Sequence, residues 1–169
     1  MTKHKIYLAS PWFSESQAER QERIYNLLKS IESLEIFNPK LHGNITGKED
    51  CDKFTAILKN NIDNITDADL IVAITDEKDM GTIWESGFAY AHKKPIIYYC
   101  ETIGDKPFNL MLAKTGKVAK TMSELVLLLQ NDEIYNWQEM LFHSSLGSSK
   151  NHSKKIPYHT HSPIFLYYL

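Results

Sequence analysis

The feature that most constrains the fold is the run LIVAI at residues 70–74, which carries no polar side chain. A strand with one face in water alternates apolar and polar residues, whereas a strand covered on both faces stays apolar throughout. Similar short apolar runs occur at residues 5–9 and 95–99, with segments of helical period between them. The chain therefore predicts a parallel sheet with helices on both faces.

The order of the predicted elements indicates how the sheet is connected. We expect strands at residues 5–9, 34–37, 70–74, 95–99 and 117–119, separated by helices at residues 14–30, 54–67, 82–93, 109–113 and 122–129. Strands that alternate with helices form right-handed βαβ units. The predicted fold is α/β, a three-layer sandwich of flavodoxin-like or Rossmann-like type. We assign residues 1–140 to this domain, and residues 141–169, which lack periodicity, to an atypical, flexible tail.

Composition narrows the class of protein. A chain of 169 residues with 43% hydrophobic residues suits one domain with a real core. The net charge of −2 provides no positive field for a phosphate backbone, and no segment approaches the roughly 20 apolar residues of a membrane span. The two cysteines lie in unrelated contexts, which fits a reducing compartment. We expect a cytoplasmic protein that binds neither nucleic acid nor membranes.

Cofactor and metal motifs give no positive signal. Neither G-x-G-x-x-G nor G-x-x-x-x-G-K-[ST] occurs, which disfavours dinucleotides and nucleoside triphosphates. The tail contains His143, His152, His159 and His161, but no acidic or Cys partner stands at ligand spacing among them. We therefore predict no cofactor and no metal.

Loops that follow the strands carry the candidate functional residues, because ligands of open α/β sheets bind outside the carboxyl ends of the strands. Tyr7 lies toward the end of the first strand, which is followed by Trp12 and Phe13, while Asp79 and Glu85 follow the third. Another loop, at residues 106–111, follows the fourth strand. Aromatic residues beside acids suit a flat, uncharged ring attached to a sugar. We predict that a nucleobase stacks on Trp12 or Phe13 beside a carboxylate.

Two carboxyl groups with different roles are the minimum set for glycosyl transfer with retention. Glu85 is expected in the first turn of its helix, where the helix dipole favours the ionised form that a nucleophile needs. Asp79, if shielded from water, could hold a proton for the leaving base. A structural interpretation remains open, because Thr82 and Glu85 also have the spacing of a capping box. Trp12 and Phe13 could likewise be loop-packing residues.

Three segments, IYLASPWF, DMGTIWESGFAYAHKKPII and KPFNLML, resemble the corresponding parts of nucleoside 2-deoxyribosyltransferases. The resemblance covers roughly residues 3–129, and its most specific piece is the Gly-x-x-x-Glu-x-Gly run that opens a helix. It implies that Glu85 forms a glycosyl ester at C1′ of the sugar. Tyr7 would orient Glu85 by a hydrogen bond, and Asp79 would bind or protonate the base.

The resemblance also implies substrates and an assembly. The substrates would be a deoxynucleoside and a free nucleobase, with the base pocket lined by Trp12, Phe13 and Phe54. Asn109 and Met111 match positions that family members insert into a neighbouring subunit's site. The active unit would therefore be a homo-oligomer, built from dimers and in many members a hexamer.

Two departures from the family pattern affect these expectations. The second helix of the family usually has an Asp that contacts the sugar, whereas this chain has Asn61, with Asp63 nearby. Asn61 can accept a hydrogen bond from the 3′-hydroxyl without a charge, and Asp63 is the alternative. The sequence after residue 140 does not resemble the family's Tyr-containing end.

Two other functions remain open at this stage. One is a 2′-deoxynucleoside 5′-monophosphate N-glycosidase that delivers water with the same glutamate. Its phosphate ligands would come from the start of the first helix, namely Ser10, Ser14, Ser16 and Arg20. The other is a non-catalytic sensor that binds a nucleoside or nucleotide in the same crevice.

Overall fold

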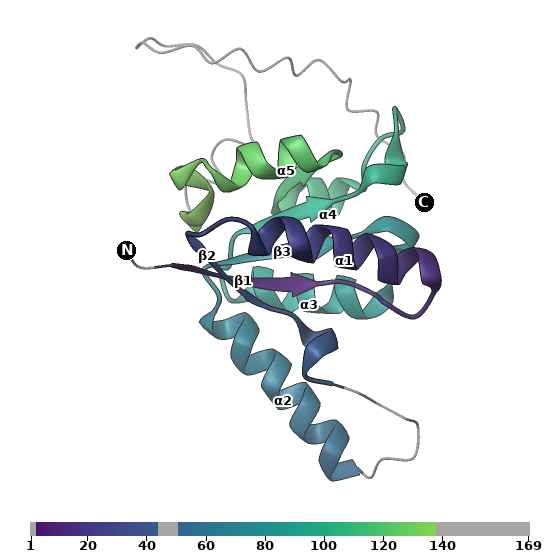
Figure 1. Cartoon of the computed structure of the whole chain (residues 1–169), viewed down its shortest axis with the longest axis vertical. Helices are drawn as coiled ribbons and strands as arrows, with labels where there is room; N and C mark the ends of the chain where they lie inside the picture. The colour runs from purple at the N-terminus through teal and green to yellow at the C-terminus, as the bar shows by residue number, and fades with distance from the viewer. Residues whose placement is uncertain (1–2, 44–50, 138–169) are drawn as a thin grey trace.

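A computed structural model describes residues 3–43 and 51–137 of the chain. Its centre is a parallel sheet in the order β2-β1-β3-β4-β5 (Figure 1). The strands are β1 (His4–Ala9), β2 (Leu34–Phe37), β3 (Leu70–Ile74), β4 (Ile96–Tyr99) and β5 (Lys117–Ala119). This order is the flavodoxin-like one. The predicted α/β fold is confirmed, whereas the predicted tail at 141–169 lies outside the described residues.

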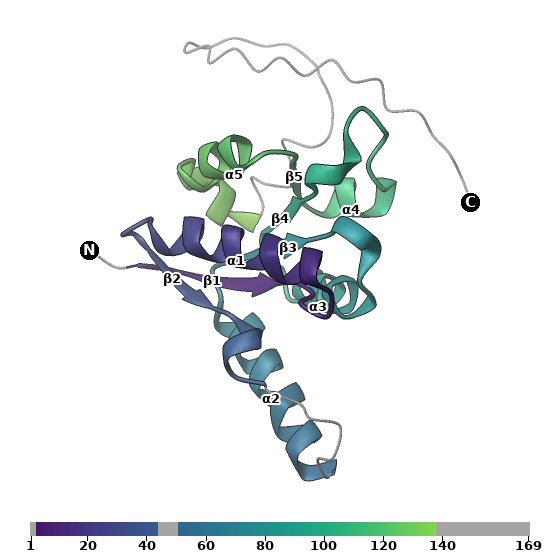
Figure 2. The ribbon, with the colours of Figure 1, turned by 45° about the vertical axis from the view of Figure 1, so that its right-hand side comes forward.

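Helices cover both faces of the sheet, as the apolar run of β3 requires. They are α1 (Glu15–Lys29), α2 (Cys51–Asp67), α3 (Met80–Ala91), α4 (Leu110–Thr115) and α5 (Met122–Leu129). One core layer packs α1 and α5 against the sheet through Ile24, Leu28 and Leu125. The opposite layer packs α2, α3 and α4 through Ile65, Ala89 and Leu112 (Figures 1 and 2).

Local sequence signals account well for most element boundaries. The predicted strands agree with the observed ones to within a residue, and every residue of β3 is buried. Ser14 caps α1 and forms the predicted capping box with Gln17, so the helix begins where two backbone N–H groups find side-chain acceptors. Since Asp79 is the N-cap of α3, that helix begins at Met80 and not at residue 82 as predicted.

The helix α2 packs on the sheet only through its last turns. Ile65 is its buried residue, and its first half projects away from the body of the molecule in both views (Figures 1 and 2). Phe54 and Leu58 on that half are 42% and 50% exposed. The end of α2 that joins β3 is therefore the part that the core holds in place.

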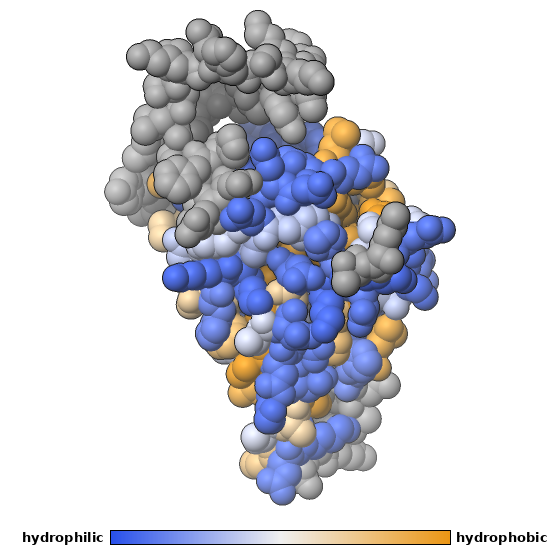
Figure 3. Space-filling view, turned by 90° about the vertical axis from the view of Figure 1, so that its left-hand side faces the viewer, coloured by the Kyte–Doolittle hydropathy of each residue, from blue (hydrophilic) through white to orange (hydrophobic). Residues whose placement is uncertain are grey.

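The two edges of the sheet differ in character. Figure 3 views the molecule from the amino ends of the strands, where the surface is mostly hydrophilic and apolar side chains form separate patches. The carboxyl ends lie on the other side and carry the loops that the sequence singles out. Within the described ranges, no helix is both long and apolar enough to cross a bilayer.

Gly116, between α4 and β5, provides a test of core packing. A Cβ at this position would lie 2.5 Å from the Ile96 carbonyl oxygen and 2.7 Å from a ring carbon of Tyr98. We expect Gly116→Ala to lower the free energy of unfolding by about 2 kcal/mol, because backbone must move to make room. Denaturant unfolding measures the change.

Gly87 is the matched control, since a Cβ there would have nothing within 4 Å. Because Gly in a helix interior is less stable than Ala, we expect Gly87→Ala to raise the free energy of unfolding by about 0.5–1 kcal/mol. Equal stability of Gly116→Ala and the wild type would contradict the close packing of Gly116 on Ile96 and Tyr98.

Candidate active site

Tyr7 and Glu85 form the centre of the candidate site. Tyr7 lies on β1 and is fully buried, with its side chain on the face of the sheet that α2 and α3 cover. Its hydroxyl donates a hydrogen bond of 2.6 Å to Oε1 of Glu85 on α3. Although 78 residues separate the two along the chain, the packing of α3 on the sheet brings them together.

The environment of Glu85 changes its acidity. Burial raises the pKa of Glu85 to about 7, the Tyr7 hydrogen bond partly opposes this rise, and the charge of Asp79 adds to it. Burial and the charge of Glu85 also raise the pKa of Tyr7, so the phenol stays protonated and remains a donor. A partly buried carboxylate with one strong donor is less well solvated than an exposed one, which favours a bond to an electron-poor carbon.

Asp79 lies directly before α3 and caps it. Its Oδ2 accepts hydrogen bonds from the backbone N–H of Thr82 at 2.7 Å and from the Thr82 hydroxyl at 2.9 Å. The capping-box interpretation of Glu85 is therefore wrong, since the shorter aspartate next to the helix already satisfies Thr82. Because the helix begins at Met80, Glu85 lies in its second turn and not in its first as predicted. From the second turn its side chain reaches Tyr7.

On α2 the structure distinguishes the two candidate sugar contacts. Asn61 is half-buried and lies one turn before Ile65, on the stripe that faces the sheet. Asp63 is exposed and pairs with Lys59 on the other side of the helix. Phe54 lies almost two turns before Asn61, on the projecting half of α2, so the structure does not bring it to Tyr7 and Glu85.

The predicted stacking residues lie between β1 and α1. Trp12 is half-buried and Phe13 is 76% exposed, and their ring centroids are 5.3 Å apart. Both follow the carboxyl end of β1, so they share an edge of the sheet with Tyr7. An aromatic ring with three quarters of its surface in water suits a flat ligand better than a core.

Asn109 and Met111 lie at the start of α4. The side-chain oxygen of Asn109 accepts hydrogen bonds from the backbone N–H groups of Met111 and Leu112, which makes it the N-cap of the helix. Met111 is 71% exposed. Neither residue contacts Glu85 of the same chain in any hydrogen bond found here, and their predicted reach into a neighbouring subunit remains a prediction.

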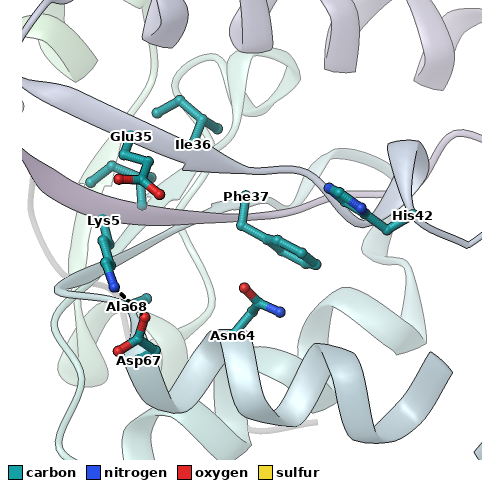
Figure 4. Close-up of a pocket in the computed structure, with 9 residues that line it drawn as sticks. Lys5, Glu35, Ile36, Phe37, His42, Asn64, Asp67 and Ala68 are labelled. Carbon is teal, nitrogen blue, oxygen red and sulfur yellow. Dashed lines mark hydrogen bonds and ion pairs between the residues drawn. The ribbon is translucent and has the colours of Figure 1, made fainter. Parts of the chain in front are cut away.

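A separate cavity of about 270 Å³ lies one strand further out, between the edge of the sheet and α2. Figure 4 shows Phe37 and Asn64 pointing into it, with the ion pair between Lys5 and Asp67 at one end. The Phe37 ring stacks on His42 and on Tyr7, at centroid distances of 4.7 and 5.5 Å. The cavity contains neither Tyr7 nor Glu85 in its lining, so we place the chemistry at the Tyr7–Glu85 pair and not in this cavity.

An ion-pair network that sequence reasoning missed lies beside the site. Arg20 on α1 contacts three carboxylates, those of Asp76, Glu77 and Glu101, at 3.8, 3.3 and 2.9 Å. The hydroxyl of Ser16 also donates to Glu77. Arg20 was a candidate phosphate ligand, and no local pattern could have indicated this role because its partners are 56 to 81 residues away.

Metal binding finds no support in the part of the chain that the structure describes. There, no group of three or more His, Cys, Asp or Glu side chains converges as a metal site would require. The four tail histidines lie outside the described residues.

The fold and this site define a flavodoxin-like α/β protein in which a partly buried glutamate of α3 accepts a hydrogen bond from a buried tyrosine of β1. The chain belongs to the nucleoside 2-deoxyribosyltransferase family, whose profile matches residues 6–122. The match includes both Tyr7 and Glu85. Family membership supports an enzyme of the deoxyribosyltransferase or N-glycosidase type, which acts on nucleosides and nucleobases.

Solved structures agree with this assignment. A 2-deoxyribosyltransferase from Bacillus psychrosaccharolyticus is 27% identical, with a TM-score of 0.65 over 72% of this chain and 89% of that one. A 2-deoxyribosyltransferase from Leishmania mexicana is 19% identical, with a TM-score of 0.57 over 76% and 99%. A CMP N-glycosidase from Clostridium botulinum is 20% identical, with a TM-score of 0.50 over 74% and 97%. The last two show a common fold only.

A search of curated protein sequences found no match. The family assignment therefore rests on the profile and on the structural similarity.

Proposed function

We propose that this protein transfers a 2-deoxyribosyl group from one nucleobase to another by double displacement on Glu85. The observation that carries the proposal is the hydrogen bond of 2.6 Å between the Tyr7 hydroxyl and Glu85 Oε1 in a partly buried site. It holds one carboxylate oxygen in place and leaves Oε2 for the sugar. No metal or cofactor is needed for this chemistry.

In the first step, a carboxylate oxygen of Glu85 bonds to C1′ of the deoxynucleoside while the bond from C1′ to the base nitrogen breaks. The electron pair of that bond leaves with the base, which takes up a proton from solvent while Asp79 contacts the base. Since Oδ2 of Asp79 already accepts two hydrogen bonds from Thr82, we assign the contact with the base to Oδ1. The transition state resembles an oxocarbenium ion, which the carboxylate stabilises.

In the second step, a nitrogen of the incoming base bonds to C1′ and the ester bond to Glu85 breaks, which restores the carboxylate. The incoming base gives its proton to solvent. A 2′-hydroxyl would withdraw electrons from the cationic sugar and so oppose both steps. The proposal therefore includes a preference for 2′-deoxy sugars, with Asn61 as the residue of α2 placed to contact the sugar.

The surroundings of Arg20 favour nucleosides over nucleotides as substrates. A 5′-monophosphate needs free donors or cations, and Ser10, Ser14, Ser16 and Arg20 were the candidates. Of these, Ser10 has a buried hydroxyl with no hydrogen-bond partner among the described residues, so it stays available to a ligand. Arg20 is surrounded by three carboxylates, and the Ser16 hydroxyl bonds to Glu77. The Ser14 side chain caps α1. Three of the four candidate phosphate ligands are therefore already engaged within the protein, which weighs against the monophosphate N-glycosidase.

Chromatography of the protein incubated with thymidine and adenine tests the proposal. We expect thymine and deoxyadenosine to appear in equal amounts. Thymine without deoxyadenosine would indicate hydrolysis, and consumption of thymidine 5′-monophosphate alone would favour the N-glycosidase. Binding of deoxynucleosides without turnover, unchanged in Glu85→Gln, would indicate the sensor. Purine deoxynucleosides are tested in parallel.

We also propose that a second copy of the chain covers the exposed side of α3 and the start of α4. Met80, Trp84 and Met111 are 85%, 51% and 71% exposed, although all three are large and apolar. Trp84 also stacks on the partly buried Phe88. Such a surface beside the site supports a homo-oligomer in which Asn109 and Met111 reach the neighbouring site.

The assembly gives a prediction that light scattering after gel filtration can check. We expect Trp84→Glu to convert the oligomer into monomers, because a charge would be buried in the interface. Leu127→Glu is the matched control: Leu127 is 66% exposed but lies on α5, which packs on the opposite face of the sheet. An oligomer that survives Trp84→Glu, or a monomeric wild type, would contradict the proposed interface.

A further inference from the structure

The connection between β3 and α3 contains two consecutive residues in the left-handed region. Glu77 has a φ of 65° and Lys78 a φ of 54°. This conformation is unfavourable for L-residues with a Cβ, and neither position has the Gly or Asn that usually adopts it. The connection also leads directly into Asp79 and, six residues later, Glu85. Backbone strain at this point needs other contacts to maintain it.

The carboxylate of Glu77 supplies those contacts. It accepts hydrogen bonds from the side chains of Gln17 at 2.8 Å, Ser16 at 3.2 Å and Arg20 at 3.3 Å, all on the first two turns of α1. The bond from Gln17, together with those from Arg20 and Ser16, holds the pKa of Glu77 below its usual value, so the carboxylate is charged at neutral pH. The strained connection is thus tied to α1.

Arg20 extends the same network to a third segment. Its Nε donates to Glu101 at 2.9 Å, and Arg23 donates to the same oxygen at 2.7 Å. Asp76, which is 1% exposed, accepts the backbone N–H of Thr102 at 2.8 Å and lies 3.8 Å from Arg20. We name Arg20, Asp76, Glu77 and Glu101 the carboxylate clamp. It joins α1, the β3–α3 connection and the segment after β4.

We propose that the carboxylate clamp positions Asp79 and the start of α3 so that Glu85 meets Tyr7, which makes Glu77 and Arg20 positioning residues of the reaction. This inference rests on the proposed function. The geometry points to it because Asp79 is both the residue that follows the strained connection and the N-cap of α3. A shift of the connection would therefore move both carboxyl groups of the site. Displacements of about 1 Å at a reacting group lower rates by up to about a hundredfold.

Two glycine variants separate the effect of losing the Glu77 carboxylate from the effect of relieving the backbone strain. Glu77→Gly and Lys78→Gly each place glycine at a left-handed position, but only Glu77→Gly removes the carboxylate that α1 holds. We expect Glu77→Gly to lower kcat for base exchange about tenfold with KM changed less than threefold. Lys78→Gly should keep kcat within twofold of the wild type. Glu77→Gln, which retains an acceptor for Arg20 and Ser16, should recover part of the lost kcat.

A second readout does not depend on turnover. Carbon-13 NMR titration of the Glu85 carboxyl group, assigned with Glu85→Gln, reports the contact with Tyr7 directly. We expect the pKa of Glu85 to rise in Glu77→Gly, because the hydrogen bond from Tyr7 weakens, and to stay unchanged in Lys78→Gly.

The outcomes separate the two proposals. Wild-type kcat and an unchanged Glu85 titration in Glu77→Gly would overturn the clamp, and so would equal losses in both glycine variants, since these would point to loop flexibility alone. If the wild type exchanges no bases but Glu85 still titrates at a higher pH in Glu77→Gly, the positioning stands and the proposed function fails.

Discussion

Glu85→Gln is expected to lower the rate of base exchange by about ten-thousandfold. Glutamine has nearly the same shape and can still accept the Tyr7 hydrogen bond, but it cannot form the ester at C1′. Deoxynucleoside binding should persist, because the pocket is unchanged. Single-turnover chromatography measures the rate, and isothermal titration calorimetry measures the binding.

The control for this variant is Glu22→Gln, which removes a carboxylate from an exposed position of α1. It should exchange bases at the wild-type rate. Exchange by Glu85→Gln within tenfold of the wild type would exclude Glu85 as the nucleophile, whereas lost binding in that variant would indicate a role in holding the substrate.

The second large effect is on the pH dependence of exchange. The nucleophile must be ionised, and burial raises the pKa of Glu85 to about 7. We therefore expect kcat/KM to fall about tenfold for each pH unit below 7, so that the rate at pH 5 is about a hundredfold below the plateau. Initial rates with saturating acceptor base, measured from pH 5 to 8, test this.

Tyr7→Phe shows whether the acidic limb of the pH profile, the fall of kcat/KM below pH 7, reports the ionisation of Glu85. The Tyr7 hydrogen bond lowers the pKa of Glu85, so its removal should move the limb to higher pH, by about one unit. Tyr98→Phe is the matched control, because Tyr98 is a buried tyrosine of the same core cluster that bonds to Thr115 instead. If the acidic limb of the pH profile does not move in Tyr7→Phe, the fall of kcat/KM reports the ionisation of a group other than Glu85.

The same pKa also links Glu85 to stability. Its folded value of about 7 exceeds the ordinary value of 4.5, so the folded state binds a proton more tightly than the unfolded state between these values. The free energy of unfolding therefore falls as pH rises from about 4.5 to about 7, by up to about 3 kcal/mol. Glu85→Gln lacks this decline and should be the more stable protein at pH 8.

Local patterns of the sequence determined much of the fold. The apolar run of β3 required a sheet covered on both faces, and Ser14 with Gln17 marked the start of α1. Each signal depends on residues within about four positions, where backbone geometry fixes which side chains meet. The identity of Glu85 as a candidate also came from its sequence context.

Tertiary structure decided which of these candidates meet. The spacing of Thr82 and Glu85 allowed a capping box. In the structure Asp79 caps the helix, and Glu85 accepts a hydrogen bond from Tyr7 on β1. The role of Arg20 changed for the same reason, since its carboxylate partners lie on segments that only the sheet order brings together. The left-handed conformation of Glu77 could not be predicted, because no glycine stands at that position. Contacts between distant segments decide such features, and hydrophobic period and cap spacing carry no information about those contacts.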